Sequence, residues 1–397
     1  MYFHRLIKNI SLRTGIIFIN QLSMFLMILI AGNRLDNYHF GVASIGLIIL
    51  QIFYAFSEWG FSIDSINEIN NSYPKSKLVS EIIYSKLFIF STLMIITIIF
   101  LSIKFEIIST LIIFWLFVAA FFSSQNNLWY FQATNQVNKV LKYNFFGRII
   151  SILIFIFLLN KNDDIYIIFL SQAVAFCIPC IYGYYFIYRQ TKFDLSCDIK
   201  LILMRLKKSF FYFITNISHN YLHTFWGILL FNQSPVSIGY FNLSDQLLRS
   251  GNYFGNIITE SLLTNYDKYR VISNIKYILF SLLAIFLVIQ IYIDDILFLF
   301  FNNKFNDSII ILRVTTISWF FLSLIKLLGY PVLGKKYSSK FFDKINLIYL
   351  FISLLIIFLY SLFFKINLLL ISFTFLILSL CYLLLIIFFI FRDYNKG

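Results

Sequence analysis

The sequence predicts an all-α, polytopic membrane protein with about twelve transmembrane helices. Apolar residues make up 60% of the 397 residues and charged residues only 13%, whereas a soluble domain carries about 25% charged residues. The apolar residues gather into stretches that approach the ~20 residues a helix needs to cross a bilayer. Lys and Arg crowd into every second connection between these stretches. This alternation is typical of a chain that crosses the membrane repeatedly with both ends in the cytosol.

The first half of the chain supplies six predicted spans. Its N-terminal apolar run is longer than the apolar core of a signal peptide, so we expect an uncleaved first span. The next five are apolar runs between short polar connections, and none shows the ~10-residue alternation of a membrane β-strand. The six spans are Thr14–Ala31, Phe40–Gly60, Leu87–Ile103, Ile107–Phe131, Tyr143–Leu159 and Ile165–Ile187.

The second half supplies six further spans. The eighth span of the chain is the weakest, because it contains Asp245, Arg249 and Glu260. It is retained because it places the charged segment Asp267–Lys276 in the cytosol. The six spans are Phe210–Phe231, Gly239–Leu263, Tyr277–Ile293, Ile309–Val332, Ile345–Phe364 and Leu368–Phe391.

The longest polar connection, Tyr188–Ser209, lies almost midway along the chain and is rich in Lys and Arg. Half-repeats joined in this way are common in transporters. We therefore predict an N-terminal six-helix lobe (1–188), a cytosolic linker (189–208) and a C-terminal six-helix lobe (209–397). The connections predicted to lie outside hold few basic residues, namely Arg34, Lys104, Lys161, Lys304 and Lys365.

Several classes of function are excluded by what surrounds the spans. The net charge of +14 does not indicate nucleic acid, because no soluble domain exists to bind it and basic residues are expected at membrane interfaces. No P-loop, dinucleotide fingerprint or G-x-S-x-G segment occurs, so no cofactor is predicted. Cys177 and Cys180 form a C-x-x-C inside an apolar run, where buried small side chains are expected rather than a redox pair or a metal site.

Polar side chains recur at three- and four-residue steps along the eighth span, which places them on one helical face. Arg249 falls near the bilayer midplane at ~1.5 Å per residue. This face predicts a water-filled cavity that binds substrate, because intramembrane polar groups usually face a cavity or a partner. A static buried network, with Asp245 and Arg249 paired at i, i+4, is the alternative. The face consists of Asn242, Asp245, Gln246, Arg249, Asn252, Asn256 and Glu260.

Other predicted spans carry further polar groups. His219 and His223 of the seventh span lie one turn apart and are candidate substrate contacts in the cavity. Plain hydrogen bonding, proton coupling and metal binding are all open for them. Arg148 and Arg313 are expected to snorkel to an interface, whereas Lys326 can either snorkel or contact an anion. We predict Glu58 and Glu260 as coupling residues. The remaining candidate substrate contacts, in the first two spans, are Asn20, Gln21 and Gln51.

Four short motifs give the chain a family resemblance. Arg34-Leu35-Asp36-Asn37-Tyr38-His39-Phe40-Gly41, Glu58-Trp59-Gly60-Phe61-Ser62, Trp129-Tyr130-Phe131-Gln132 and Ile238-Gly239-Tyr240-Phe241 are similar to segments of Wzx-type flippases of polysaccharide repeat units. These flippases belong to the multidrug/oligosaccharidyl-lipid/polysaccharide exporter superfamily. The sequence departs from the family pattern at Asp36 and Ala133, where Gly is usual, and at Glu58 and Trp59, where Asp and Phe are usual.

The resemblance implies a MATE-like fold, in which two six-helix lobes enclose a central cavity that opens to the two sides in turn. It implies a flippase of the bacterial inner membrane whose cargo is an undecaprenyl-pyrophosphate-linked oligosaccharide, such as an O-antigen unit. It also implies membrane lipids, a polysaccharide polymerase and a chain-length regulator as partners. Two alternatives stay open: a multidrug-type small-molecule exporter, and an enzyme that polymerises polysaccharide or transfers sugars. The absence of a large outside connection disfavours the enzyme.

Overall fold

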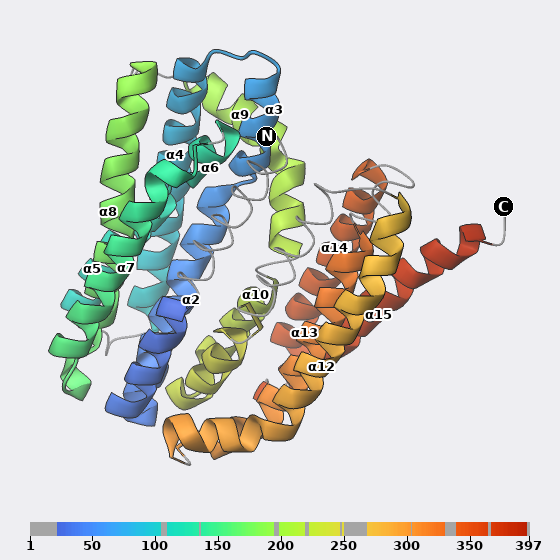
Figure 1. The fold of residues 1–397 in the computed structure, drawn as a ribbon. Helices are drawn as coiled ribbons and strands as arrows, with labels where there is room; N and C mark the ends of the chain where they lie inside the picture. The colour runs from blue at the N-terminus through green and yellow to red at the C-terminus, as the bar shows by residue number, and fades with distance from the viewer. Residues whose placement is uncertain are drawn as a thin grey trace. The chain divides into compact units, whose positions relative to one another are not determined.

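The computed structural model describes residues 22–104, 109–134, 136–193, 198–218, 222–246, 248–249, 268–302, 304–329, 339–363 and 367–394. These residues form helices joined by turns, and no strand occurs among them (Figure 1). The predicted all-α class is therefore confirmed.

Helical stretches long and apolar enough to cross a membrane recur along both halves of the chain. Each coincides with one of the predicted spans. The first, seventh and eighth predicted spans include residues outside the described ranges, so the multi-pass architecture is confirmed and the number twelve stays a prediction. In the described residues these stretches number nine: Asn37–Asn70, Lys75–Ser102, Thr110–Ala133, Asn138–Leu158, Asn162–Thr191, Leu279–Phe301, Asn306–Leu328, Lys344–Phe363 and Leu368–Ile390.

The chain divides into two compact units, Met1–Asn216 and Ile217–Gly397. The boundary falls at the end of helix α9 (Ile199–Asn216), which belongs with the first unit. Residues 199–208, which the sequence assigns to a linker, are thus helical. The predicted lobe boundaries themselves stay a prediction.

The first unit is a group of long helices in which α8 (Tyr166–Thr191) packs between α5 (Thr110–Ser124) and α7 (Asn138–Leu158). Helix α2 (Asn37–Glu58) packs against α5 and α4 (Lys75–Lys104) (Figure 1). Short α6 (Leu128–Ala133) packs against α3 (Phe61–Asn70). Buried aromatic side chains fill the interior of this unit, namely Phe40, Phe53, Phe131, Phe155 and Phe169.

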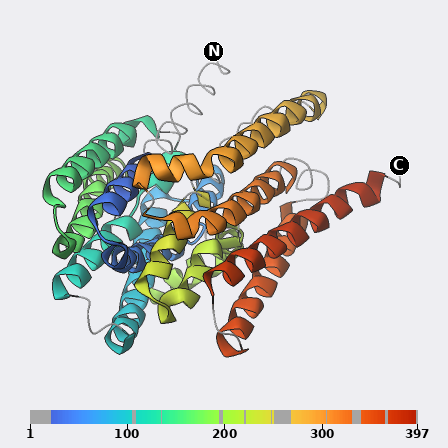
Figure 2. The same cartoon turned by 90° about the horizontal axis from the view of Figure 1, so that it is seen from below.

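The second unit contains α10 (Leu222–Ile228), α12 (Lys268–Phe301), α13 (Ile309–Leu328), α14 (Ser339–Phe363) and α15 (Leu368–Tyr394). Helix α13 packs against both α12 and α15. Figure 2 shows these helices from below, coloured from yellow-green to red. Their outward faces carry large apolar side chains, such as Phe280, Leu299 and Phe363, as expected of helices in lipid.

The stretch formed by α2 and α3 is interrupted at Trp59 and Gly60, both in the left-handed backbone region with φ of 34° and 71°. Gly60 is required there because a Cβ atom would lie 2.4 Å from Cβ of Tyr212 and 2.8 Å from the backbone nitrogen of Phe213. Left-handed conformations are costly for residues other than glycine. Helix α9 therefore lies directly over the joint between α2 and α3. Helix α2 ends at Glu58, just before the left-handed Trp59.

Candidate functional site

Three of the site residues predicted from the sequence lie together in the second unit. Nδ1 of His223 lies 2.7 Å from Oδ1 of Asp245, and Nε of Arg249 lies 3.0 Å from Oδ2 of the same carboxylate. Asp245 is fully buried, and His223 and Arg249 are 3% and 8% exposed. Asp245 and Arg249 are four residues apart on one helical turn, so the pairing that the sequence offers as an alternative is present.

A fourth residue, Thr224, was not predicted. Its hydroxyl lies 3.2 Å from Oδ2 of Asp245, and it follows His223 directly on α10. A threonine inside an apolar run gives no signal in the sequence, because its hydroxyl usually bonds its own helix backbone. We call His223, Thr224, Asp245 and Arg249 the Asp245 cluster.

Ring contacts orient His223 in the Asp245 cluster, and some polar nitrogen atoms of the cluster and its neighbour Gln246 have no partner in the described part of the chain. The His223 ring stacks on Phe241 and meets the edge of Phe375 on α15, with ring centroids 4.6 Å apart in each case. Among the described residues, the donors Nη2 of Arg249 and Nε2 of Gln246 have no hydrogen-bond partner. The same holds for Nε2 of His223, whose donor or acceptor role depends on the tautomer of the ring. A buried donor without a partner costs about 1–3 kcal/mol. Such donors favour an anion or a hydroxyl group as a ligand.

The first unit holds a second charged pair. Nζ of the fully buried Lys86 donates to the backbone oxygen of Asn126 (2.7 Å) and lies 4.0 Å from Oε2 of Glu58. The Glu58 side chain is 17% exposed and accepts a hydrogen bond from Ser62. Lys86 was not predicted as a partner of Glu58, because the sequence places it just ahead of the third span.

Gln51 lies two turns before Glu58 on α2 and is 6% exposed. Neither its amide oxygen nor its amide nitrogen has a hydrogen-bond partner among the described residues. This is the surrounding expected of a side chain that contacts a polar ligand, since buried amides are otherwise almost always paired.

The basic residues that were predicted to reach a membrane interface, or for which this stayed open, differ in their burial and in their partners. The prediction that Arg148 snorkels is wrong: it is 5% exposed, donates to Gln172 (3.3 Å) and lies over the ring of Phe176. Arg313 is an exposed residue of α13 paired with Asp294 (2.9 Å). Lys326, also on α13, is buried at 6% exposure.

Six of the candidate residues lie outside the part of the chain that the structure describes. The predicted cavity face of the eighth span is therefore described only as far as Arg249, and the polar face of the first span is not described. The His219–His223 metal pair stays open for the same reason, and the described residues contain no group of three metal-ligating side chains. The six are Asn20, Gln21, His219, Asn252, Asn256 and Glu260.

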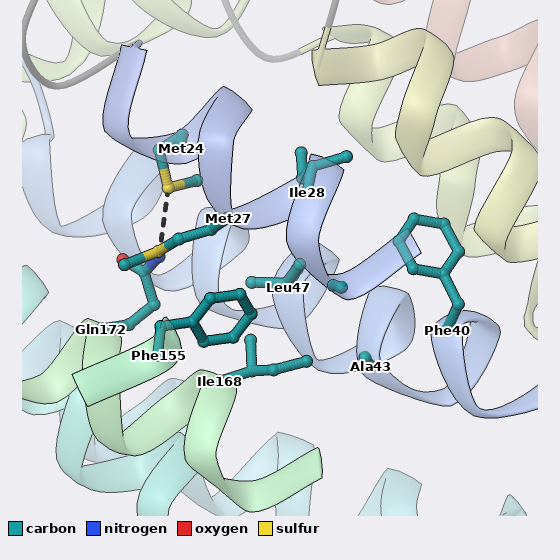
Figure 3. Close-up of a pocket in the computed structure, with 10 residues that line it drawn as sticks. Met24, Met27, Ile28, Phe40, Ala43, Leu47, Phe155, Ile168 and Gln172 are labelled. Atoms are coloured by element: carbon teal, nitrogen blue, oxygen red, sulfur yellow. Dashed lines mark hydrogen bonds between the residues drawn. The ribbon is translucent and has the colours of Figure 1, made fainter. Parts of the chain in front are cut away.

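A cavity of about 10 Å³ is present in the first unit, next to Gln172 (Figure 3). It has room for about one water molecule. Gln172 donates to the sulfur atoms of Met24 and Met27 at 3.2 and 3.0 Å, and the other lining residues are apolar. This cavity is too small and too apolar to bind an oligosaccharide. The lining consists of Met24, Met27, Ile28, Ala31, Phe40, Ala43, Leu47, Phe155, Ile168 and Gln172.

The four sequence motifs are mostly structural. Asp36 caps α2 by accepting a hydrogen bond from the backbone N–H of His39 (2.7 Å). The aromatic residues Trp129, Tyr130 and Phe131 of α6 are at most 1% exposed. They pack α6 against its neighbours.

A family model described as "Polysaccharide biosynthesis protein" matches residues 6–263, more than half of the chain. The chain belongs to this family. No curated protein matches this sequence.

Solved structures share the fold of this chain, among them the three that follow. One, described as "protein A", has a TM-score of 0.64 at 15% identity, covering 99% of this chain and 96% of the other. An outward-facing multidrug resistance MATE family transporter of the MOP superfamily has a TM-score of 0.53 at 13% identity, covering 95% of each chain. The lipid II flippase MurJ, in an inward closed conformation, has a TM-score of 0.51 at 13% identity, covering 96% of this chain and 100% of the other. An all-helical fold like that of MATE transporters and MurJ is thus confirmed, while the two six-helix lobes and the central cavity stay a prediction.

Proposed function

We propose that this chain is a Wzx-type flippase, which moves an undecaprenyl-pyrophosphate-linked oligosaccharide from the cytosolic to the outer leaflet of the bacterial inner membrane by alternating access. The Asp245 cluster is the observation that carries the proposal. It places a cation with a spare guanidinium nitrogen inside an apolar helical unit. Family membership and the likeness to a lipid II flippase support the same class of activity.

The chemistry of the cargo explains why such a site is needed. Each sugar hydroxyl costs a few kcal/mol to bury without a partner, so an oligosaccharide head does not cross a bilayer unaided. Polar side chains inside the protein replace water for the head, while the polyprenyl tail remains in lipid. Gln51, Gln246 and His223 are the described residues that we assign to this lining, with Lys326 as a further cation.

Arg249 is assigned to the pyrophosphate. Nε of Arg249 lies 3.0 Å from Oδ2 of Asp245 as an ion pair, and Nη2, which has no hydrogen-bond partner among the described residues, is left for a phosphate oxygen. Arginine suits this role because its planar fork forms short charge-assisted bonds to phosphate. At 4 Å and an effective dielectric near 20, the attraction is about 4 kcal/mol. An inside-negative membrane potential adds about 2.3 kcal/mol per negative charge per 100 mV to outward movement.

Flipping in reconstituted vesicles tests the proposal directly. Vesicles with the purified protein receive a fluorescent undecaprenyl-pyrophosphate oligosaccharide in one leaflet, and a membrane-impermeant quencher reports its transfer. We expect Arg249→Ala to abolish transfer and Arg249→Lys to retain part of it. Arg313→Ala is the matched control, since Arg313 is an exposed, ion-paired arginine of the same unit. Wild-type transfer by Arg249→Ala would contradict the assignment of Arg249 to the cargo.

A multidrug-type exporter is the second candidate, favoured by the likeness to a multidrug resistance transporter. It predicts that deletion of the gene raises drug sensitivity and leaves surface polysaccharide intact. The flippase predicts the reverse. Deletion alone does not separate the flippase from an enzyme, because loss of either activity would remove surface polysaccharide. The purified protein separates them: a flippase transfers the lipid-linked glycan unchanged, whereas an enzyme lengthens it or transfers its sugars.

A further inference from the structure

Helix α9 is fixed to the first unit by a buried group of charges. Arg205 of α9 donates from Nη1 to Asp64 of α3 (2.9 Å) and from Nε to Glu81 of α4 (2.9 Å). Lys208, one turn later, pairs with Glu68 of α3, which also lies 3.8 Å from Arg205. We call Arg205, Lys208, Asp64, Glu68 and Glu81 the clamp.

The clamp is almost fully buried, apart from the ammonium of Lys208, and contains more carboxylates than cations. Arg205 is 5% exposed, and Asp64, Glu68 and Glu81 are between 2% and 4% exposed. Three buried carboxylates thus share one buried cation and one largely exposed ammonium. The hydroxyl of Tyr73 also donates to Glu81 (2.7 Å). Withdrawing α9 would leave the three carboxylates buried together without Arg205, which is strongly unfavourable.

A second set of contacts fixes α9 to the joint between α2 and α3. The indole nitrogen of Trp59 donates to the backbone oxygen of Leu206 (2.9 Å), and its ring stacks on Phe213 at a centroid distance of 3.9 Å. Tyr212 accepts a hydrogen bond from Asn67 (3.0 Å). Gly60 leaves no space for even a Cβ atom beneath α9, so the backbones of α9 and the joint lie in direct contact.

We propose that α9 remains attached to the first unit throughout the transport cycle, so that any movement of the second unit begins after Asn216. The clamp then acts as a positioning device: it keeps Trp59 and Gly60 in their left-handed conformations, and these hold Glu58 opposite Lys86. Ile217 and Ser218, directly after α9, have π-helical geometry, and π-bulges are among the sites at which helices kink. The inference rests on the proposed transport function, whereas its first test does not.

A charge exchange tests the clamp without any cargo. Arg205→Glu is expected to lower the unfolding temperature and the yield of folded protein in detergent. The double variant Arg205→Glu with Glu81→Arg restores opposite charges across the contact between α9 and α4 and is expected to recover part of the loss, because the new carboxylate still lies beside Asp64. Lys207→Glu makes the same change of charge on the exposed face of α9 and is expected to have little effect. A double variant no more stable than Arg205→Glu alone, or a Lys207→Glu variant equally damaged, would overturn the clamp.

A reversible cross-link tests whether α9 stays in place. Asn67→Cys and Tyr212→Cys, in a background whose native cysteines are replaced by serine, are joined by a short reducible bifunctional thiol reagent. The side chains of these two positions meet in the structure, so we expect efficient cross-linking and unchanged flipping. Failure to cross-link, or flipping that is lost and returns with reductant, would overturn the proposal. If flipping is absent even before cross-linking, the proposed function has failed, and the charge exchange alone decides the clamp.

Discussion

Lys86 lies 4.0 Å from Glu58, and the two differ in their access to solvent. The lysine side chain is 1% exposed and the glutamate side chain 17% exposed. The pair joins α4 to the end of α2, at the joint that α9 covers. Because a buried charge is costly when its partner is removed, the two residues are not equivalent targets for mutation.

We expect Glu58→Gln to destabilise the protein more than Lys86→Met. The glutamine variant leaves a buried ammonium with only the Asn126 carbonyl, at a cost of up to about 3 kcal/mol. The methionine variant leaves a carboxylate that can reach solvent and is expected to be close to neutral. Thermal unfolding in detergent measures both, and equal losses would contradict the unequal dependence of the two charges on the pair.

The Asp245 cluster offers a test that separates stability from transport. Asp245→Asn leaves Arg249 buried without its counter-charge and is expected to cost about 3 kcal/mol. The double variant Asp245→Asn with Arg249→Met removes both charges and is expected to recover stability while flipping stays lost. Unfolding temperature and vesicle transfer are read on the same preparations. A double variant that flips cargo would remove Arg249 from the mechanism.

Gly60→Ala is expected to be severely destabilising. The left-handed conformation alone costs an alanine about 1–2 kcal/mol, and the added methyl group would collide with Tyr212 and Phe213 of α9. The loss should appear as a lower unfolding temperature together with weaker cross-linking between α9 and α3. An unchanged unfolding temperature would mean that α9 does not lie over the joint.

The clamp should weaken at alkaline pH. Burial and the hydrogen bond to Glu81 raise the pKa of Tyr73 from 10.0 to about 12. A group whose pKa is raised on folding stabilises the protein fully below its unfolded pKa and loses that effect as the pH rises through the folded value. The stability difference between wild type and Tyr73→Phe is therefore expected to shrink between about pH 10 and pH 12. A difference that is constant over this range would contradict the hydrogen bond to Glu81.

The membrane fold could be predicted from the sequence because its signals are local. Apolar runs and basic connections are read within about twenty residues. The Asp245–Arg249 pair could be predicted for the same reason, because residues four apart lie on the same face of a helix. Thr224 and Lys86 were missed because their roles depend on which helices pack together.

Arg205 is the clearest case of a residue whose role the sequence conceals. It lies in a run of Lys and Arg, and such runs usually belong to solvated connections. Its partners Asp64 and Glu81 are more than 120 residues away, and no spacing rule links them. Arg148 was misassigned for a related reason, because Gln172, which accepts from it, lies on the next helix.

The placement of α9 determines where this protein can be divided into two polypeptides. A chain break between α8 and α9 would place Arg205 and Lys208 on the C-terminal fragment. The N-terminal fragment would then keep the three buried carboxylates of the clamp without these cations. That fragment would then require its complement even to fold. A break after α9 would give each fragment its own counter-ions, so co-expressed halves divided there are the ones suited to reassembly.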